Sequence, residues 1–124
     1  MRVLYIGQDP STVDFSDPAL PPGLSAEKIA AGIEQAVQAM KEEGWTAEFC
    51  SVTPDPAAAL TTAEPQLGAG WDCVLFGGGL RAPPKAVALF EALVNAARRL
   101  APDAVMAFNN APEESVEAVR RACG

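Results

Sequence analysis

A strand pattern that leads directly into three glycines and then into a helical pattern constrains this chain more than any other feature. Residues 73–76 are apolar at every position, which is typical of a strand buried on both faces of a parallel sheet. Three consecutive glycines follow at 77–79, and a helical spacing of apolar residues begins at Pro83. A strand, a glycine loop and a helix in this order predict an open α/β sheet, whose ligands usually bind beyond the carboxyl ends of the strands.

The rest of the chain repeats this alternation of strand and helix. The predicted strands are residues 3–6, 47–52, 73–76 and 104–108, and the predicted helices are residues 26–43, 56–60, 83–100 and a segment after residue 110. Ser25 is the expected N-cap of the first helix and Gly44 its left-handed terminator, while Asn110 is the expected N-cap of the last helix. Pro65 is expected to break the second helix, and the third helix is expected to bury Val87.

Strands joined by connections of this length pair in parallel, and each crossover is right-handed. We therefore expect one α/β domain over residues 1–124, with a single open parallel four-stranded sheet in the order 2-1-3-4 and helices on both faces. This is the flavodoxin-like arrangement without its fifth strand. In that order the first and third strands are neighbours whose connections leave toward opposite sides, so a crevice forms between their carboxyl ends.

Net charge and residue usage exclude several classes of function. A formal charge of −7 disfavours nucleic acid and anionic membrane surfaces as partners, since both need a basic face. There is no apolar run of membrane-spanning length and no signal-peptide pattern, so we expect a cytoplasmic location with Cys50, Cys73 and Cys123 as reduced thiols. The absence of histidine excludes Ser-His and Cys-His nucleophile pairs and any histidine metal site, and no metal site is predicted.

Glycines, amides and one arginine converge on the predicted crevice. The candidate ligand-binding residues are Gly7, Gln8 and Asp9 after the first strand, Gly77, Gly78, Gly79 and Arg81 after the third, and Asn109 after the fourth. Three successive glycines allow backbone amides to point at a ligand in conformations that other residues avoid. Arg81 carries a planar donor fork that matches phosphate or carboxylate. These residues predict a site for a small anionic metabolite, and they identify no cofactor.

Each candidate also has a purely structural interpretation. The glycines can serve a tight turn, Arg81 can pair with Asp9 across the crevice, and Asp9 precedes a proline, as turn formers often do. Pro83 and Pro84 remove two amides from the following helix, so an anion would depend on the glycine loop. The long connection 8–24 is either a lid over the end of the sheet or a packed surface loop.

The positions that carry activity in several families of this shape hold other residues here. A response-regulator receiver needs an aspartate at the end of the third strand, where Gly77 stands. Low-molecular-weight phosphatases and sugar-transport IIB domains need a cysteine at the end of the first strand, and none is there. Flavodoxins place a hydroxyl- and glycine-rich phosphate loop at that position, whereas residues 8–12 have the hydroxyls and lack the glycine.

Three segments carry a likeness to known proteins: Val-Leu-Tyr-Ile-Gly-Gln-Asp-Pro at 3–10, Gly-Gly-Gly-Leu-Arg-Ala-Pro-Pro-Lys at 77–85 and Phe-Asn-Asn-Ala-Pro-Glu-Glu at 108–114. In these segments the chain resembles short, uncharacterised bacterial proteins of flavodoxin-like shape. The resemblance covers most of the chain and implies the fold. It implies no activity, because none is known for those proteins.

Three functions therefore remain open. The first is binding of a small anionic molecule at the crevice, with the connection 8–24 closing over it. The second is an enzyme that uses Asp9 as its general base. The third is an assembly role: residues 104–108 form an edge strand with no charge or proline, and a homodimer that pairs or covers this edge would protect it.

Overall fold

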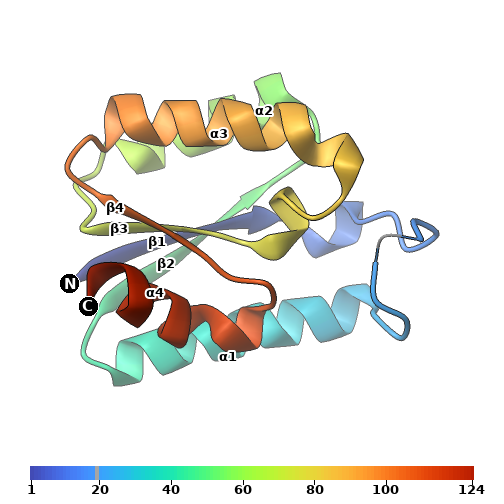
Figure 1. Cartoon of the computed structure of the whole chain (residues 1–124), viewed down its shortest axis with the longest axis horizontal. Coiled ribbons are helices and arrows are strands. Elements are labelled where there is room, and N and C mark those ends of the chain that lie inside the picture. Colours follow the sequence, from blue (N-terminus) through green and yellow to red (C-terminus); the bar gives the residue numbers. More distant parts are fainter. Residues whose placement is uncertain (19) are drawn as a thin grey trace.

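A strand that is apolar on both faces has to be buried on both sides, and in this protein a layer of helices packs on each face of the sheet (Figure 1). The computed structural model describes residues 1–18 and 20–124, so position 19 of the predicted 8–24 connection lies outside the described residues. The strands are β1 (Arg2–Gln8), β2 (Thr46–Val52), β3 (Cys73–Phe76) and β4 (Val105–Phe108), and the α-helices are α1 (Ala26–Glu42), α2 (Pro56–Leu67), α3 (Val87–Leu100) and α4 (Ser115–Cys123). Short 3-10 turns occur at η1 (Pro10–Thr12), η2 (Gly78–Leu80), η3 (Pro84–Ala86) and η4 (Pro112–Glu114).

The strands form one parallel sheet in the order β2-β1-β3-β4, which confirms the predicted flavodoxin-like α/β topology. Alternate residues of β1 serve two separate cores, because successive side chains of a strand point to opposite faces. Leu4 and Ile6 pack with α2 and α3, whereas Val3 and Tyr5 pack with α1 and α4. Because all the strand pairs are parallel, the carboxyl ends of the strands lie at one end of the layers, beside η1 (Figure 1).

The first helix begins and ends where its sequence predicts. Ser25 caps α1, since its hydroxyl oxygen accepts a hydrogen bond from the Lys28 amide at 3.2 Å. Gly44 follows the helix with φ of +89°, a left-handed conformation that glycine adopts without strain.

The prediction that Pro65 breaks the second helix is wrong. Asp55 caps α2 by accepting from the Ala58 amide at 2.9 Å, and the helix continues to Leu67 with Pro65 inside it. Pro65 sits in the last turn and is exposed, so it removes one backbone hydrogen bond without ending the helix. The Gly68 amide still donates to the Glu64 carbonyl at 3.3 Å.

Two further helix predictions are wrong for related reasons. Val87, which was predicted to be buried, is 56% exposed. The three-residue turn η3 precedes α3 and changes which side of the helix faces the core, so the buried residues of α3 are Leu89, Leu93, Ala96 and Ala97. Asn110 does not cap the last helix, because Pro112 opens the separate turn η4 and α4 begins only at Ser115. The side-chain oxygen of Asn110 accepts a hydrogen bond from Arg81 at 3.1 Å instead.

No helix within residues 1–18 and 20–124 is both long and apolar enough to cross a membrane. Cys50 and Cys73 are free thiols inside strands, fully buried as small apolar side chains, and Cys123 is a free, half-buried thiol.

Candidate functional site

A cleft of about 710 Å³ opens at the carboxyl ends of β1 and β3. The carboxyl end of β1 contributes Gly7 and Gln8 to its lining, and the segments after β3 and β4 contribute Gly77, Gly78, Gly79 and Asn110. Helix α1 contributes Lys28, Ile29, Ala31, Gly32 and Ile33, and the loop after η1 contributes Val13, Asp14, Asp17, Leu20 and Leu24. The volume lies within the range of roughly 300–1,000 Å³ that small-molecule sites occupy. The cleft also lies at the topological switch point of the sheet, where ligands of open α/β folds bind.

The glycine loop forms one wall, and most of its amides already donate within the protein. The Gly77 amide donates to the Ile6 carbonyl at 2.9 Å, and the Gly78 amide donates to the Asn109 side-chain oxygen at 3.0 Å. Leu80 donates to the Gly77 carbonyl at 3.1 Å, which closes η2. In the part of the chain that the structure describes, the Gly79 amide has no acceptor, and Gly79 lines the cleft, so this amide is available to a ligand.

The prediction that these glycines adopt conformations closed to other residues is wrong, since the described glycines with positive φ are Gly23, Gly44 and Gly70. Close approach explains Gly78 instead. A Cβ at Gly78 would lie 2.7 Å from the backbone oxygen of Asn110, nearer than real contacts allow. A Cβ at Gly79 would meet nothing within 4 Å. Gly78 therefore lets the segment after β4 pack against the loop, whereas Gly79 borders open space.

Asn109 stands behind the cleft as the centre of a buried polar network. It is 2% exposed, and its side-chain nitrogen donates to the Tyr5 hydroxyl at 3.3 Å and to the Ser115 hydroxyl at 3.0 Å. Burial raises the pKa of Tyr5, while its hydrogen bonds with Asn109 and Ser115 act in the opposite direction. Because both ends of the Asn109 amide are occupied, this residue fastens β4 to the glycine loop and to α4.

Arg81 and Asp9 do not form the ion pair that the sequence suggested. One terminal nitrogen of Arg81 donates to the Asn109 carbonyl at 2.7 Å and to the Asn110 side chain at 3.1 Å. The Asp9 carboxylate accepts from the amide and the hydroxyl of Ser11, each at 2.9 Å, so Asp9 forms a local turn. Of the predicted site residues, Gly7, Gln8, Gly77, Gly78 and Gly79 line the cleft, and Asp9, Arg81 and Asn109 lie outside its lining.

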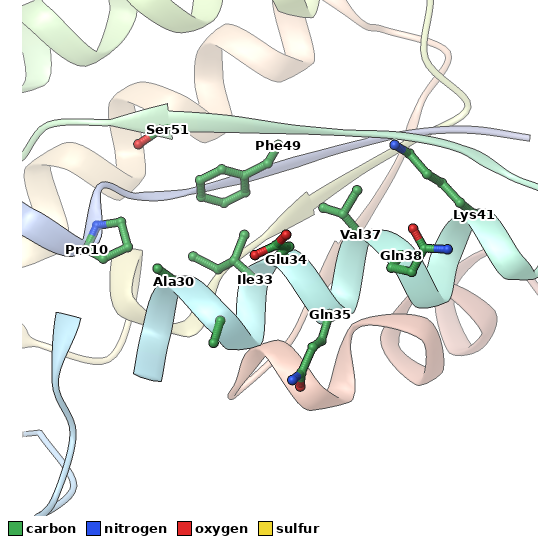
Figure 2. A pocket seen from close by; sticks show the side chains of 11 residues that line it. Pro10, Ala30, Ile33, Glu34, Gln35, Val37, Gln38, Lys41, Phe49 and Ser51 are labelled. Carbon is green, nitrogen blue, oxygen red and sulfur yellow. The ribbon is translucent and has the colours of Figure 1, made fainter. Parts of the chain in front are cut away.

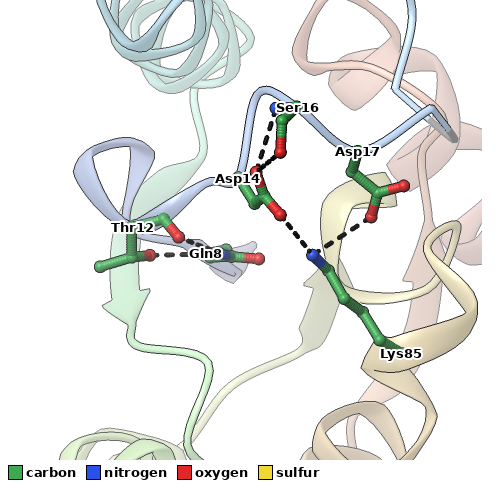
Figure 3. A network of polar contacts seen from close by, with 6 residues as sticks. All are labelled: Gln8, Thr12, Asp14, Ser16, Asp17 and Lys85. Carbon is green, nitrogen blue, oxygen red and sulfur yellow. Dashed lines mark hydrogen bonds and ion pairs between the residues drawn. The ribbon is translucent and has the colours of Figure 1, made fainter.

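The second wall is the loop that follows η1, and Lys85 connects it to the β3 side of the cleft (Figure 3). The Lys85 ammonium lies 3.1 Å from an oxygen of Asp14 and 3.3 Å from an oxygen of Asp17. Hydrogen bonds from Ser16 and the contact with Lys85 lower the pKa of Asp14 to about 2. At the base of the loop, the Gln8 side chain donates to the Thr12 carbonyl at 3.1 Å and to its hydroxyl at 3.2 Å.

Residues of α1 and η4 complete the cleft, and the sequence reasoning missed them. Gly32 lets the helix approach η4 closely, since a Cβ there would lie 3.2 Å from a carboxylate oxygen of Glu113. A topological signal was available: a helix that follows a parallel strand starts at the carboxyl end of the sheet, so its first turns border that end. Lys28 and Ile29 are in those first turns.

A second hollow, the α1–β2 groove, lies along the β2 edge of the sheet (Figure 2). Its volume is about 820 Å³, larger than that of the cleft. Phe49 and Ser51 of β2 face Ala30, Ile33 and Val37 of α1 across it (Figure 2). Its lining comes almost entirely from one side of α1 and from β2, and the ends of neighbouring strands do not meet there. Ligands of open α/β folds bind where strand ends meet, so the smaller cleft is the better candidate site.

The described residues contain no group of three or more His, Cys, Asp or Glu side chains placed to hold a metal ion. Burial raises the pKa of Cys50 to about 11 and also raises that of Cys73, so neither buried thiol is an activated nucleophile. No model of a known protein family matches the chain, and no curated protein matches it. What is shown is a small α/β protein with a flavodoxin-like sheet, matched to no family of known activity.

Proposed function

We propose that this protein binds a small molecule in the cleft between the carboxyl ends of β1 and β3. The observation that carries the proposal is that Gly79, whose amide donates to no acceptor among the described residues, lines a ligand-sized cleft at the switch point of the sheet. A carbonyl or carboxylate oxygen of the ligand would accept that hydrogen bond.

The charges around the cleft favour a ligand that is mainly apolar. Its lining holds three acidic residues, Asp14, Asp17 and Glu113, against two lysines. Lys85 already contacts two carboxylates, and the Lys28 ammonium donates to the Gly23 carbonyl at 2.9 Å. A multiply charged anion would therefore meet net negative charge and engaged cations. We therefore propose a mainly apolar molecule with one acceptor group in place of the anionic metabolite predicted from the sequence.

Apolar side chains supply the rest of the binding surface. Val13 and Leu20 from the loop and Ile29 and Ile33 from α1 all line the cleft. Burial of an apolar ligand surface against such side chains contributes about 25 cal/mol per Å² removed from water. The hydrogen bond to Gly79 would then orient the ligand more than it adds to affinity.

Catalysis with Asp9 as the general base has no support in this geometry, because Asp9 caps η1 and lies outside the cleft lining. The three free cysteines support a reducing environment, and we accordingly place the protein in the cytoplasm as part of the proposal.

Native mass spectrometry of the freshly purified protein, compared with its denatured mass, tests the proposal. We expect a small additional mass on the folded wild-type chain. The Ala82→Phe variant places a large side chain at an exposed position just after η2 that lines the cleft and not the α1–β2 groove, and it should lose that mass. Ala57→Phe, at an exposed position of α2 on the opposite face of the sheet, is the matched control and should keep it.

Retention of the extra mass by Ala82→Phe would place the ligand outside the cleft. A wild-type protein that carries no extra mass would contradict a ligand held tightly enough to survive purification.

A further inference from the structure

The β4 side of the molecule carries apolar side chains that no part of the described chain covers fully. Val87 is 56% exposed and Phe108 is 37% exposed, and Phe90, Val94 and Met106 beside them are half-buried. We call these five residues, together with Glu91 and Arg98, the α3–β4 flank. Contiguous exposed apolar surface of this kind marks interaction sites more often than isolated apolar residues do.

The flank is continuous because the outer side of α3 leans over β4. The rings of Phe90 and Phe108 lie 6.1 Å apart, so Phe90 marks the side of the helix that faces β4. Val87 and Val94 are three and four residues from Phe90, which places them on the same side. On the other flank of the helix, Arg99 pairs with Glu64 of α2 at 3.0 Å.

The hydrogen-bonding edge of β4 is partly occupied. Within the described sheet β4 pairs with β3 alone, and its four residues include no charge or proline. However, Arg121 donates to the Phe108 carbonyl at 2.8 Å. An arginine thus occupies a carbonyl at the end of the strand, and we take side-chain packing rather than strand pairing as the mode of association.

Charges on the flank match a second copy of the same surface. Glu91 and Arg98 are exposed, and within residues 1–18 and 20–124 neither makes an ion pair. They are seven residues apart, two helical turns or about 10.5 Å along one side of α3, with Val94 between them. Antiparallel packing of two α3 helices about a twofold axis near Val94 brings Glu91 of each chain opposite Arg98 of the partner subunit.

We propose that this protein forms a homodimer through the α3–β4 flank, with the two copies of α3 antiparallel and related by a twofold axis. Such an interface is self-complementary, since the same residues of both chains meet. Val94 lies at its centre between the two Glu91–Arg98 pairs, and Phe90, Phe108 and Val87 of each chain continue the apolar contact away from the axis. The net charge of −7 per chain opposes association, so the dimer depends on the match of the flank charges as well as on apolar packing.

Sedimentation velocity from low to high micromolar concentration tests this proposal on the intact chain. We expect a monomer–dimer equilibrium in the wild-type protein. Glu91→Arg or Arg98→Glu alone should weaken dimerisation roughly tenfold or more, because each substitution juxtaposes like charges. The double reversal Glu91→Arg/Arg98→Glu should restore it, and all three variants should unfold like the wild type because both side chains are exposed.

Glu34→Arg is the matched control, an exposed charge reversal on α1 beside the α1–β2 groove at the opposite edge of the sheet. It should leave the dimer unchanged. The proposal is overturned by a wild-type protein that stays monomeric at high micromolar concentration, by a double reversal that fails to rescue, or by a dimer that Glu34→Arg breaks and Glu91→Arg does not.

Discussion

The two walls of the cleft differ in how the protein holds them. In the glycine wall, Gly77, Gly78 and Leu80 are buried, and hydrogen bonds tie the loop to β1 and to Asn109. In the loop wall, none of the described residues in 13–18 and 20–24 is buried, and the backbone hydrogen bonds among the described residues there form local turns. The ion pairs of Lys85 with Asp14 and Asp17 connect the loop wall to the other side.

This difference indicates a division of roles. A segment whose backbone is mostly buried and hydrogen-bonded keeps its geometry when a ligand arrives, whereas a segment with few buried contacts opens at low free-energy cost. We therefore expect the glycine wall to present the Gly79 amide in a fixed position and the loop wall to adjust to the ligand. Substitutions in the first wall should reduce global stability, and substitutions in the second should change local opening.

The largest effect is expected from Asn109→Ala. Loss of the side chain leaves the Gly78 amide and the hydroxyls of Tyr5 and Ser115 without their present partner in a buried site. Each such group costs about 1–3 kcal/mol when unpaired, so we expect the free energy of unfolding to fall by about 3 kcal/mol in urea titrations. Asn110→Ala is the control: this exposed side chain loses only its bond from Arg81, and a loss comparable to that of Asn109→Ala would contradict the network.

Gly78→Ala should come next, with a loss of about 2 kcal/mol from overpacking. The added methyl group would meet the Asn110 backbone oxygen at 2.7 Å, and a backbone atom cannot move aside as the tip of a side chain can. Gly79→Ala, one residue along the same loop, should change stability by less than about 0.5 kcal/mol. Equal unfolding midpoints for the two variants would show that the close approach after β4 does not constrain the glycine wall.

Lys85→Gln should act on the loop wall and leave global stability nearly unchanged, because the ammonium and the Asp14 carboxylate it contacts are exposed to solvent. The expected result is faster amide hydrogen exchange in residues 13–18, which high salt should reproduce in the wild type. Lys41→Gln on α1, which removes a lysine without an ion pair among the described residues, should leave that exchange unchanged.

The smallest effect is a pH dependence of the same wall. The pKa of Asp14 is lowered from 3.8 to about 2, so its stabilising contribution is fully present above 3.8 and is lost as the pH falls through about 2. Hydrogen bonds from Ser16 are the main cause, and Lys85 is the next. A carboxyl-carbon NMR titration should therefore find a higher Asp14 pKa in both Ser16→Ala and Lys85→Gln than in the wild type. An Asp14 pKa that stays at the wild-type value in Ser16→Ala would contradict the role of the Ser16 hydroxyl.

Element order and sheet topology could be predicted because they depend on local patterns. The apolar run 73–76, the cap at Ser25 and the turn at Gly44 are each readable from a few neighbouring residues. Predictions were wrong where the surrounding structure outweighed a local sequence rule. Pro65 lies in the last turn of α2, where a proline does not end the helix, and the turn η3 rotated α3 so that Val87 faces away from the core.

The candidate site divides in the same way. The backbone positions Gly7 and Gly79 line the cleft because strand ends and topology alone determine where they lie. The long side chain of Arg81 has several reachable partners, and the packing of β4 against β3 put the Asn109 carbonyl nearest. The sequence alone does not indicate whether Arg81 binds the Asn109 carbonyl or the Asp9 carboxylate.

The central claim is that the cleft, and not the α1–β2 groove, receives a ligand. Two-dimensional amide NMR of the ¹⁵N-labelled protein with a library of small, mainly apolar fragments that carry one carbonyl group tests it directly. We predict that binding fragments shift the amides of Gly79, Gly7 and Gly32, and that Ala82→Phe, which alters the cleft and not the groove, abolishes these shifts. Fragments that shift Phe49 and Ser51 of the groove while Gly79 stays unchanged would contradict the claim.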